Sequence, residues 1–403
     1  MSTERLHDAP APAGVPSFDV NLHDDDFFAD PFPVYDELRE AGPVVWMSHY
    51  GYYASARYDE VAMMLSDWES FTSAQGVGFN DMFNSIHETS LQTEGDTHDE
   101  IRRIEGIPLK PQPLDELKPR LRSFAENLVE GLRSRDRIDG VHDVAKAMPI
   151  EIVTDLVGVE GLSPDQLFGY GVAGFDSIGP LDAHRTLPAL QHMGGYVEFA
   201  QANFPGKCRA GGWADQLFKN GQAAGWPEEL CRGVMNDYIY PSIDSTIASI
   251  GIGLLLFGQN PDQWDMLRND RSLLSKAIPE IVRVASPLQF FTRLVAKDSE
   301  VSGTAVPAGS RIIMLYGAAN RDPRKFHDPN RFDITRSPLH QLGWGRGKHS
   351  CLGKPLARLE MMTLFDVLAD NVERFEIGDY RYKSNNIIRS LGELDLGIVW
   401  TAR

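Results

Sequence analysis

The chain has 403 residues, 42% of them hydrophobic and 24% charged, so it carries enough apolar material for a large buried core. Its formal net charge of -18 argues against nucleic acid and anionic membranes as partners, because both are bound through clustered Lys and Arg. Three cysteines without tight spacing argue against a disulfide framework and favour a reducing compartment.

The N-terminal residues show no signal-peptide pattern, and the longest strongly apolar stretch, 247–258, is too short to span a bilayer. We therefore expect a cytoplasmic protein without a membrane span. Residues 1–25 are rich in Ala, Pro and acidic groups, and we predict that this segment is disordered.

The first ordered element is a predicted helix at 33–41, which ends at a Gly-Pro pair. Two β-rich runs, 44–49 and 52–57, predict a hairpin, and a helix follows at 58–67.

Beyond residue 100 the patterns are mostly helical, with strands predicted within 293–315 and 375–402 and a Gly-rich loop at 343–353. The predicted helices are 114–135, 143–158, 187–203, 228–258, 261–268, 271–285 and 355–371. The order of elements predicts one large domain over residues 26–403 that is mainly α with small β-sheets, not alternating βα units.

The Gly-rich loop contains Cys351 and leads into a helix whose first turn holds Pro355. Gly345, Gly347 and Gly353 allow tight turns and close approach of the backbone. A sulfur at a helix N-terminus lies where negative charge is stabilised, so Cys351 is placed to be a nucleophile or a metal ligand. A buried, inert side chain is the common state of a lone cysteine, and this alternative stays open.

This loop resembles the haem-binding signature of the cytochrome P-450 family, Phe-x-x-Gly-x-x-x-Cys-x-Gly, with Trp344 in place of the Phe. The resemblance extends over about residues 30–400. It implies a cytochrome P-450 fold in which haem b (iron protoporphyrin IX) lies between the long central helix and the helix after the loop. It also implies Cys351 as the iron ligand, Trp344 and Gly345 beside the haem, and monooxygenase activity.

Other motifs follow in the family's order. Glu280 and Arg283 lie three residues apart on a predicted helix and can pair. The resemblance implies that this pair is buried and engages the segment around Arg331.

The resemblance further implies four side chains that hold the haem propionates: His98, Arg102, Arg293 and His349. Cationic donors are needed wherever two carboxylates are buried in a protein.

The stretch around Asp244, Ser245 and Thr246 resembles the family's oxygen-activating segment, Ala-Gly-x-Asp-Thr-Thr. The resemblance implies that the acid and the alcohols deliver protons. Ser245 aligns with the family's threonine, and Pro241 predicts a kink within the long helix.

Within the family the chain is most similar to soluble bacterial members that oxidise small aromatic ethers and acids, notably para-methoxybenzoate demethylases. That likeness implies an apolar pocket suited to a flat ring. Its lining would be Phe79, Met82, Phe83, Ser90, Leu91, Phe175, Ile178, Ile239, Leu288, Phe290, Phe291 and Leu391.

The polar end of that pocket departs from benzoate-selective members, which hold a carboxylate with basic and hydroxyl groups. Here the corresponding residues are His87, Asn236 and Asp237, while Ser90 is retained. An acidic group opposes a carboxylate substrate by like-charge repulsion. We therefore expect a neutral methoxy-phenol such as a guaiacol, with O-demethylation as the reaction.

Three alternatives stay open: a para-substituted benzoate or terpenoid hydroxylase of the same family, a non-catalytic haem-binding or sensor protein, and a cysteine hydrolase using Cys351 and His349. Because the sequence has no flavin or iron–sulfur motif, we expect a ferredoxin or an iron–sulfur flavin reductase, driven by NAD(P)H, as the electron donor to this O2-using enzyme. We expect a monomer. The cations nearest the thiolate side would steer such an acidic donor: Arg102, Arg103, Lys110, Arg346, Lys348 and Arg358.

Overall fold

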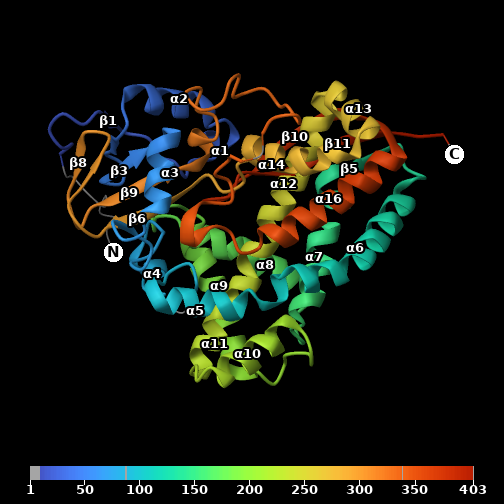
Figure 1. Ribbon diagram of the computed structural model, residues 1–403, viewed down its shortest axis with the longest axis horizontal. Helices are drawn as coiled ribbons and strands as arrows, with labels where there is room; N and C mark the ends of the chain where they lie inside the picture. The colour runs from blue at the N-terminus through green and yellow to red at the C-terminus, as the bar shows by residue number, and fades with distance from the viewer. Residues whose placement is uncertain (1–9, 87–88, 338, 403) are drawn as a thin grey trace.

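The computed structural model describes residues 10–86, 89–337 and 339–402. A β-rich part lies at one end of the molecule and a larger helical part at the other (Figure 1). The mainly α architecture with small sheets in one domain is as predicted.

The β-rich end is built on a six-stranded sheet with the order β1-β2-β3-β9-β6-β4. Its strands are β1 Ser17–Phe18, β2 Val45–Met47, β3 Tyr52–Ser55, β4 Phe71–Thr72, β6 Phe290–Val295 and β9 Arg311–Leu315. The predicted hairpin is β2 and β3, which pair antiparallel, and β3 then pairs in parallel with β9. Helices α1 Asp25–Ala29, α2 Phe32–Ala41 and α3 Tyr58–Ser66 belong to the same end.

The predicted disorder of residues 1–25 is wrong for residues 10–25. Strand β1 pairs in parallel with β2, and the side chain of Leu22 is fully buried. Composition favoured disorder, but a short edge strand and one buried side chain attach this segment to the sheet. Residues 1–9 lie outside the described ranges.

The helical end contains the long elements. They are α5 Gly95–Glu105, α6 Pro111–Leu132, α7 Ala147–Val157, α8 Pro164–Asp176, α9 Thr186–Asn203, α10 Trp213–Ala223, α11 Glu228–Met235, α12 Tyr240–Gln259, α13 Pro261–Asn269, α14 Leu274–Ala285 and α16 Lys354–Asn371. Short helices are α4 Asp81–Asn84 and α15 Tyr316–Ala319. Three of these helices, α5, α8 and α10, were not among the predicted ranges. Glycines within α8 and α10 lower their helix propensity.

The predicted helix 228–258 is interrupted. A 3-10 turn, Asn236–Tyr238, separates α11 from α12, and Pro241 lies in the first turn of α12. The irregularity predicted at Pro241 therefore takes the form of a break between two helices, and Pro241 lies in the first turn after it, where a proline removes no helical hydrogen bond.

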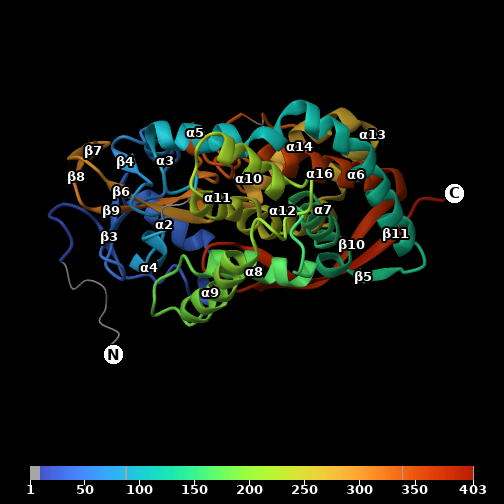
Figure 2. The same cartoon turned by 90° about the horizontal axis from the view of Figure 1, so that it is seen from below.

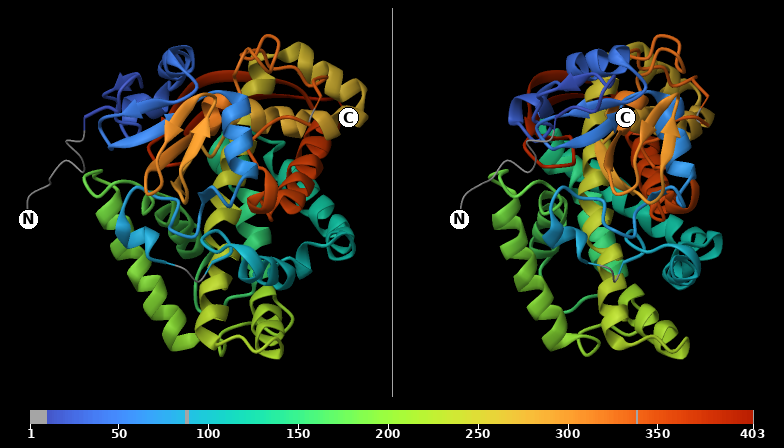
Figure 3. Two further views of the ribbon diagram at one scale, coloured as in Figure 1. Left: turned by 60° about the vertical axis from the view of Figure 1, so that its left-hand side comes forward. Right: turned by 90° about the vertical axis from the view of Figure 1, so that its left-hand side faces the viewer.

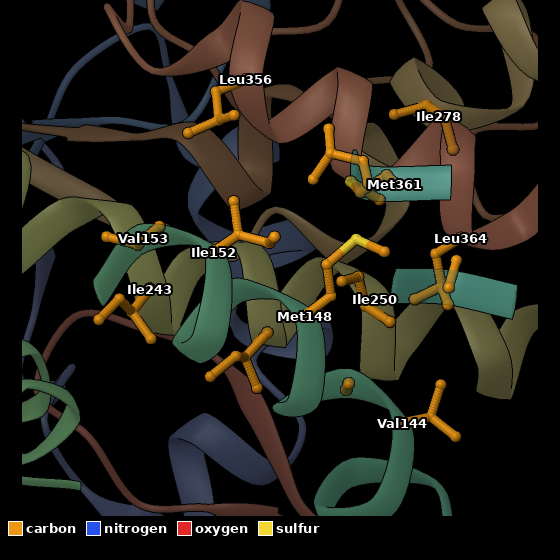
Figure 4. Packing of buried hydrophobic residues seen from close by; sticks show 14 of the residues in the cluster. Val144, Met148, Ile152, Val153, Ile243, Ile250, Ile278, Leu356, Met361 and Leu364 are labelled. Carbon is orange, nitrogen blue, oxygen red and sulfur yellow. The ribbon is translucent and has the colours of Figure 1, made fainter. Parts of the chain in front are cut away.

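Helix α12 runs through the middle of the molecule, with α16 on one side and α9 farther out on the other (Figure 3). Its side chains pack against α7, α14 and α16 in the core, where Ile250, Met148, Ile278 and Leu364 are fully buried (Figure 4). Among the described residues one segment, Glu228–Gln259, is long and apolar enough to cross a membrane, and 78% of its most apolar stretch is buried inside the protein. Its apolar character is explained by its place in the core.

The C-terminal segment forms a second sheet of β10 Val372–Lys383, β11 Ser390–Trp400 and β5 Arg137–Asp139, in the order β10-β11-β5. This sheet lies along the helical end, away from the larger sheet (Figure 2). The hairpin of β7 Ser299–Val301 and β8 Thr304–Val306 completes the β structure of the described residues.

Candidate active site

A cavity of about 280 Å³ lies between the start of α16 and the first half of α12. The Cys loop and α16 supply one wall, including Trp344, Cys351 and Leu356. The opposite wall comes from α12, and the end of α5, the segment before it and β6 close the sides. The cavity thus brings together segments that lie far apart in the chain, from Leu65 to Ile388.

The loop before Cys351 turns as its glycines require. Gly345 and Gly347 have φ values of +65° and +70°, and a Cβ on Gly347 would lie 2.8 Å from the backbone oxygen of Leu65. The N–H of Cys351 donates to the carbonyl of Trp344 at 2.8 Å, which closes the loop. The sulfur then faces the cavity three residues before α16 begins.

Two opposing effects act on the thiol of Cys351. Burial raises its pKa, while hydrogen bonds from the backbone N–H groups of Gly353 and Lys354 and the charge of Arg102 oppose that rise. Cys351 is exposed toward the cavity but surrounded by protein. The predicted stabilisation of a thiolate by the helix start is present, yet burial outweighs it in the protein alone.

Three of the four expected propionate partners line the cavity: Arg102, Arg293 and His349. The guanidinium of Arg293 is buried, burial lowers its pKa, and its Nη1 has no hydrogen-bond partner among the described residues. His98 does not line the cavity, but its ring lies 4.5 Å from that of His349 and its Nε2 is also buried without a described partner.

His349 has a carboxylate partner that the sequence did not reveal. Its Nε2 lies 3.0 Å from Oε2 of Glu94, and Glu94 also accepts hydrogen bonds from the N–H and hydroxyl of Ser73. Burial lowers the pKa of His349 despite this contact. Nothing in the local sequence of Glu94 links it to a residue 255 positions later.

The Glu280–Arg283 pair is buried as the resemblance implied. Arg283 also donates to the carbonyls of Asn320, Pro329 and Arg331. The pair engages the segment around Arg331 as the resemblance implied, and Arg331 itself contributes its backbone carbonyl. A second cation, the unpredicted Arg336, also reaches Glu280, and its Nε lies 3.2 Å from Oε1.

On α12, Ser245 and Thr246 line the cavity and Asp244 does not. The hydroxyl of Ser245 donates to the carbonyl of Pro241 at 2.8 Å, and that of Thr246 to Ser242 at 3.3 Å. Asp244 is buried, and its Oδ2 has no described partner. The two hydroxyls therefore face the same space as Cys351, whereas the carboxylate lies behind them.

Seven of the residues expected in the pocket line the cavity, and they come from the segment before α5, from α8 and its end, and from β6 and the loop before it. They are Phe83, Ser90, Leu91, Phe175, Ile178, Leu288 and Phe291. Other apolar parts of the lining, including Trp213, Tyr240 and Tyr316, were not predicted.

Five expected pocket residues lie elsewhere. Met82 is 56% exposed at the surface, while Phe79, Ile239, Phe290 and Leu391 are packed in the core. Phe79 and Phe290 pack edge to face against each other and against His23. An apolar side chain near a cavity can point to either side of its backbone, and only the fold decides which.

The polar end of the cavity holds two carboxyl groups. Asp237 accepts hydrogen bonds from the N–H and hydroxyl of Ser90 at 2.7 and 2.9 Å. Glu105, the last residue of α5, is buried beside it and was not predicted. Asn236 does not line the cavity, and His87 lies outside the described residues.

These groups fit haem b. A cysteine sulfur, a buried guanidinium with a free N–H, and paired histidines face or flank a cavity whose walls are otherwise largely apolar. Free cysteines throughout the described residues agree with the predicted lack of disulfides.

Comparison with known proteins agrees with this geometry. A cytochrome P-450 family model matches residues 254–384. The chain is 31% identical over 392 residues to the cytochrome P-450 CYP199A2 of Rhodopseudomonas palustris, covering 95% of both chains. The chain belongs to the cytochrome P-450 family.

A second relative is linalool 8-monooxygenase of Pseudomonas putida, 28% identical with 92% of this chain and 96% of the relative covered. Among solved structures, Mycobacterium marinum cytochrome P-450 CYP268A2 in complex with pseudoionone superposes with a TM-score of 0.84 at 23% identity, covering 96% of this chain and 100% of that one. The fold is therefore that of cytochromes P-450, and the chain is a monooxygenase of the bacterial type that binds haem b.

Proposed function

We propose that this monooxygenase holds haem b through Cys351 and O-demethylates a small neutral methoxy-phenol such as a guaiacol. The observation that carries the substrate class is the Asp237 carboxylate, which lines the cavity and is fixed by two hydrogen bonds from Ser90. A benzoate would place a second carboxylate against it, and like charges at short range in a buried site repel strongly.

In this proposal Arg102, Arg293, His98 and His349 hold the haem propionates, with Trp344 and Gly345 beside the ring. The buried, unpaired N–H of Arg293 supports this assignment, because a buried guanidinium needs an anionic partner. The bound haem supplies the activation of O2. The protein supplies the sulfur ligand, excludes bulk water and aims the substrate.

We assign the delivery of protons for oxygen activation to the hydroxyls of Ser245 and Thr246, which line the cavity. Asp244 is assigned as the buried acid behind them. Each hydroxyl donates to a carbonyl one turn earlier in α12, so its lone pairs remain available toward the cavity.

The mostly apolar walls suit an aromatic ring, and the side chains expected to contact it are Phe83, Phe175, Leu288 and Phe291. Linalool 8-monooxygenase among the relatives keeps a terpenoid as the second candidate substrate. A linear terpenoid alcohol shares the neutral, hydroxyl-bearing character that Asp237 favours.

Electrons must reach the haem from a partner. We propose a ferredoxin or an iron–sulfur flavin reductase driven by NAD(P)H, in the cytoplasm, with this protein as a monomer. Arg102, Arg103, Arg346 and Lys348 lie around the Cys loop and α5 and would attract an acidic donor despite the net charge of -18.

The test uses the holoenzyme with a surrogate ferredoxin system. Formaldehyde release from 2-methoxyphenol, with NADH consumption matched to product, is expected, and 4-methoxybenzoate should be turned over at least about tenfold more slowly, since one buried like-charge contact costs more than about 1.4 kcal/mol. Faster turnover of 4-methoxybenzoate would reject the proposed substrate class.

The assignment of Cys351 is tested separately. Cys351→Ala should abolish the reduced carbon monoxide spectrum of a thiolate-ligated haem, whereas Cys231→Ala, which alters a buried cysteine away from the cavity, should leave it intact. An unchanged spectrum in Cys351→Ala would remove the ligand assignment and with it the monooxygenase mechanism proposed here. If the protein were a non-catalytic haem sensor, the unaltered protein would show this spectrum but would form no product from 2-methoxyphenol.

A further inference from the structure

We propose that Glu105 and Asp237 act as a carboxyl pair in the cavity wall that selects substrates by a neutral hydroxyl group on the ring. The inference rests on the proposed function and deepens it. It assigns Glu105 a specificity role and names the feature of the substrate that is recognised, a hydrogen-bond donor.

Two separate elements bring the carboxyl groups together. Glu105 is the last residue of α5, and Asp237 lies in the 3-10 turn that separates α11 from α12. The hydroxyl of Tyr238 donates to the backbone carbonyl of Glu105 at 2.6 Å and fixes the two elements to each other. Glu105, Asp237, Tyr238 and Ser90 all line the cavity.

The pair has more acceptors than donors. Both hydrogen bonds that Asp237 accepts from described residues end on Oδ2. The Oε2 of Glu105 is buried without a partner among the described residues. The charge of Arg102 acts on both groups, but the hydrogen bond that Arg102 donates goes to the carbonyl of Ser350. A hydroxyl entering from the cavity would supply the missing donor, and a buried acceptor left unpaired is costly.

The pair also carries little charge for two acids. Burial raises the pKa of Asp237 to about 6, and burial together with the neighbouring Asp237 raises that of Glu105 well above its usual value. The pair therefore carries less negative charge than two free carboxylates would. A carboxylate of the pair accepts a strong hydrogen bond from a neutral hydroxyl and repels a carboxylate substrate. The positive charge of Arg102 weakens the attraction that the carboxyl pair would otherwise exert on an ammonium group.

Ligands of matched size separate the contribution of the hydrogen bond to affinity from the contribution of shape. Fluorine resembles a hydroxyl in size but cannot donate, so 2-fluoroanisole is the control for 2-methoxyphenol. Spin-state titration of the ferric holoenzyme should give a dissociation constant about tenfold lower for 2-methoxyphenol, the gain expected from a hydrogen bond to a charged group. Equal affinities would overturn the inference, and so would tighter binding of 2-methoxyphenyl-trimethylammonium, which would indicate recognition of charge.

Variants then locate the acceptor. Asp237→Leu should remove the preference, and Asp237→Asn, which keeps a neutral acceptor, should reduce it to about threefold, because neutral hydrogen bonds are about half as strong. The double variant Glu105→Gln with Asp237→Asn should gain affinity for 2-methoxybenzoate. Ser242→Ala, which alters another polar group of the same wall, should change none of these ratios.

An undiminished preference for 2-methoxyphenol over 2-fluoroanisole in Asp237→Leu would overturn the inference. If that variant fails to bind haem, the same comparison in Asp237→Asn decides. The proposed function fails independently. Two further ligands, 2-ethylphenol and 1-ethyl-2-fluorobenzene, contain no ether that could be cleaved. If the enzyme binds 2-ethylphenol more tightly but releases no formaldehyde from 2-methoxyphenol, the hydroxyl recognition stands and the demethylation is rejected. Formaldehyde release without any hydroxyl preference would do the reverse.

Discussion

Arg283 binds Glu280 through two hydrogen bonds, from Nε to Oε2 at 2.7 Å and from Nη2 to Oε1 at 2.8 Å, with both side chains almost fully buried. The same guanidinium reaches three backbone carbonyls, and Glu280 accepts from the N–H of Asp333 and from Arg336. The pair thereby fixes the segment that leads into the Cys loop.

Removing one partner of this pair should destabilise the protein strongly. Arg283→Ala removes two hydrogen bonds from the buried Glu280 carboxylate and the three that Arg283 donates to backbone carbonyls. We expect a loss of about 3–5 kcal/mol in the free energy of unfolding. Urea unfolding measures the loss. The exposed pair Arg374–Glu376 is the control, because Arg374→Ala should cost less than about 1 kcal/mol. Equal losses would contradict the structural role of the buried pair.

Arg293 should stabilise the haem-bound protein and destabilise the protein without haem. Because its buried Nη1 has no described partner, Arg293→Met should raise the stability of the haem-free protein by about 1–4 kcal/mol. Loss of a charged hydrogen bond to a propionate should speed haem transfer to apomyoglobin about tenfold or more.

Arg311 on the neighbouring strand β9 is the control for Arg293. It already donates to the carbonyls of Gly76 and Gln75, so Arg311→Met should destabilise the haem-free protein and leave haem transfer unchanged. Unchanged haem transfer in Arg293→Met would remove the propionate assignment.

Asp176 should make stability depend on pH in the direction opposite to most carboxylates. Burial raises its pKa to about 6 in the folded protein, so the charged form is disfavoured there. The contribution of Asp176 to the stability of the folded protein is fully present below the pKa that its carboxyl has in the unfolded chain, and it is lost as the pH rises through 6. Asp176→Asn should therefore be close to neutral at pH 4 and stabilising by about 1–3 kcal/mol at pH 8.

Asp143 provides a control of opposite sign. Arg135 and the N–H of Asp139 hold its pKa below the usual value despite partial burial, so its contribution is present at neutral pH and lost in acid. Asp143→Asn should destabilise at pH 8, with the loss fading toward pH 3. A stabilising effect of Asp176→Asn that is equal at pH 4 and pH 8 would contradict the assignment.

Ser245 should matter for coupling more than for binding. Ser245→Ala removes the hydroxyl assigned to proton delivery, and we expect product formed per NADH to fall about tenfold or more, a usual effect of losing an acid–base group. Substrate dissociation constants should change little. Ser249→Ala, one turn farther along the same cavity wall, is the control and should leave coupling intact. Unchanged coupling in Ser245→Ala would assign delivery to another group.

Local patterns in the sequence determined much of this protein. Gly345, Gly347, Cys351 and Pro355 specify a loop that turns tightly and starts a helix, because glycine permits positive φ and proline suits a first turn. Spacing of three residues placed Glu280 and Arg283 on one helix face. Such features depend on neighbours along the chain, so the sequence carries them directly.

Tertiary structure alone decided which distant side chains meet. Glu94 and His349 are 255 residues apart, and Glu105 meets Asp237 only because α5 ends beside the break before α12. Periodicity likewise could not tell that Phe79 points into the core while Phe83 reaches the cavity. Long-range packing fixes these relationships, since the energies that select them arise between segments and leave no local pattern in the sequence.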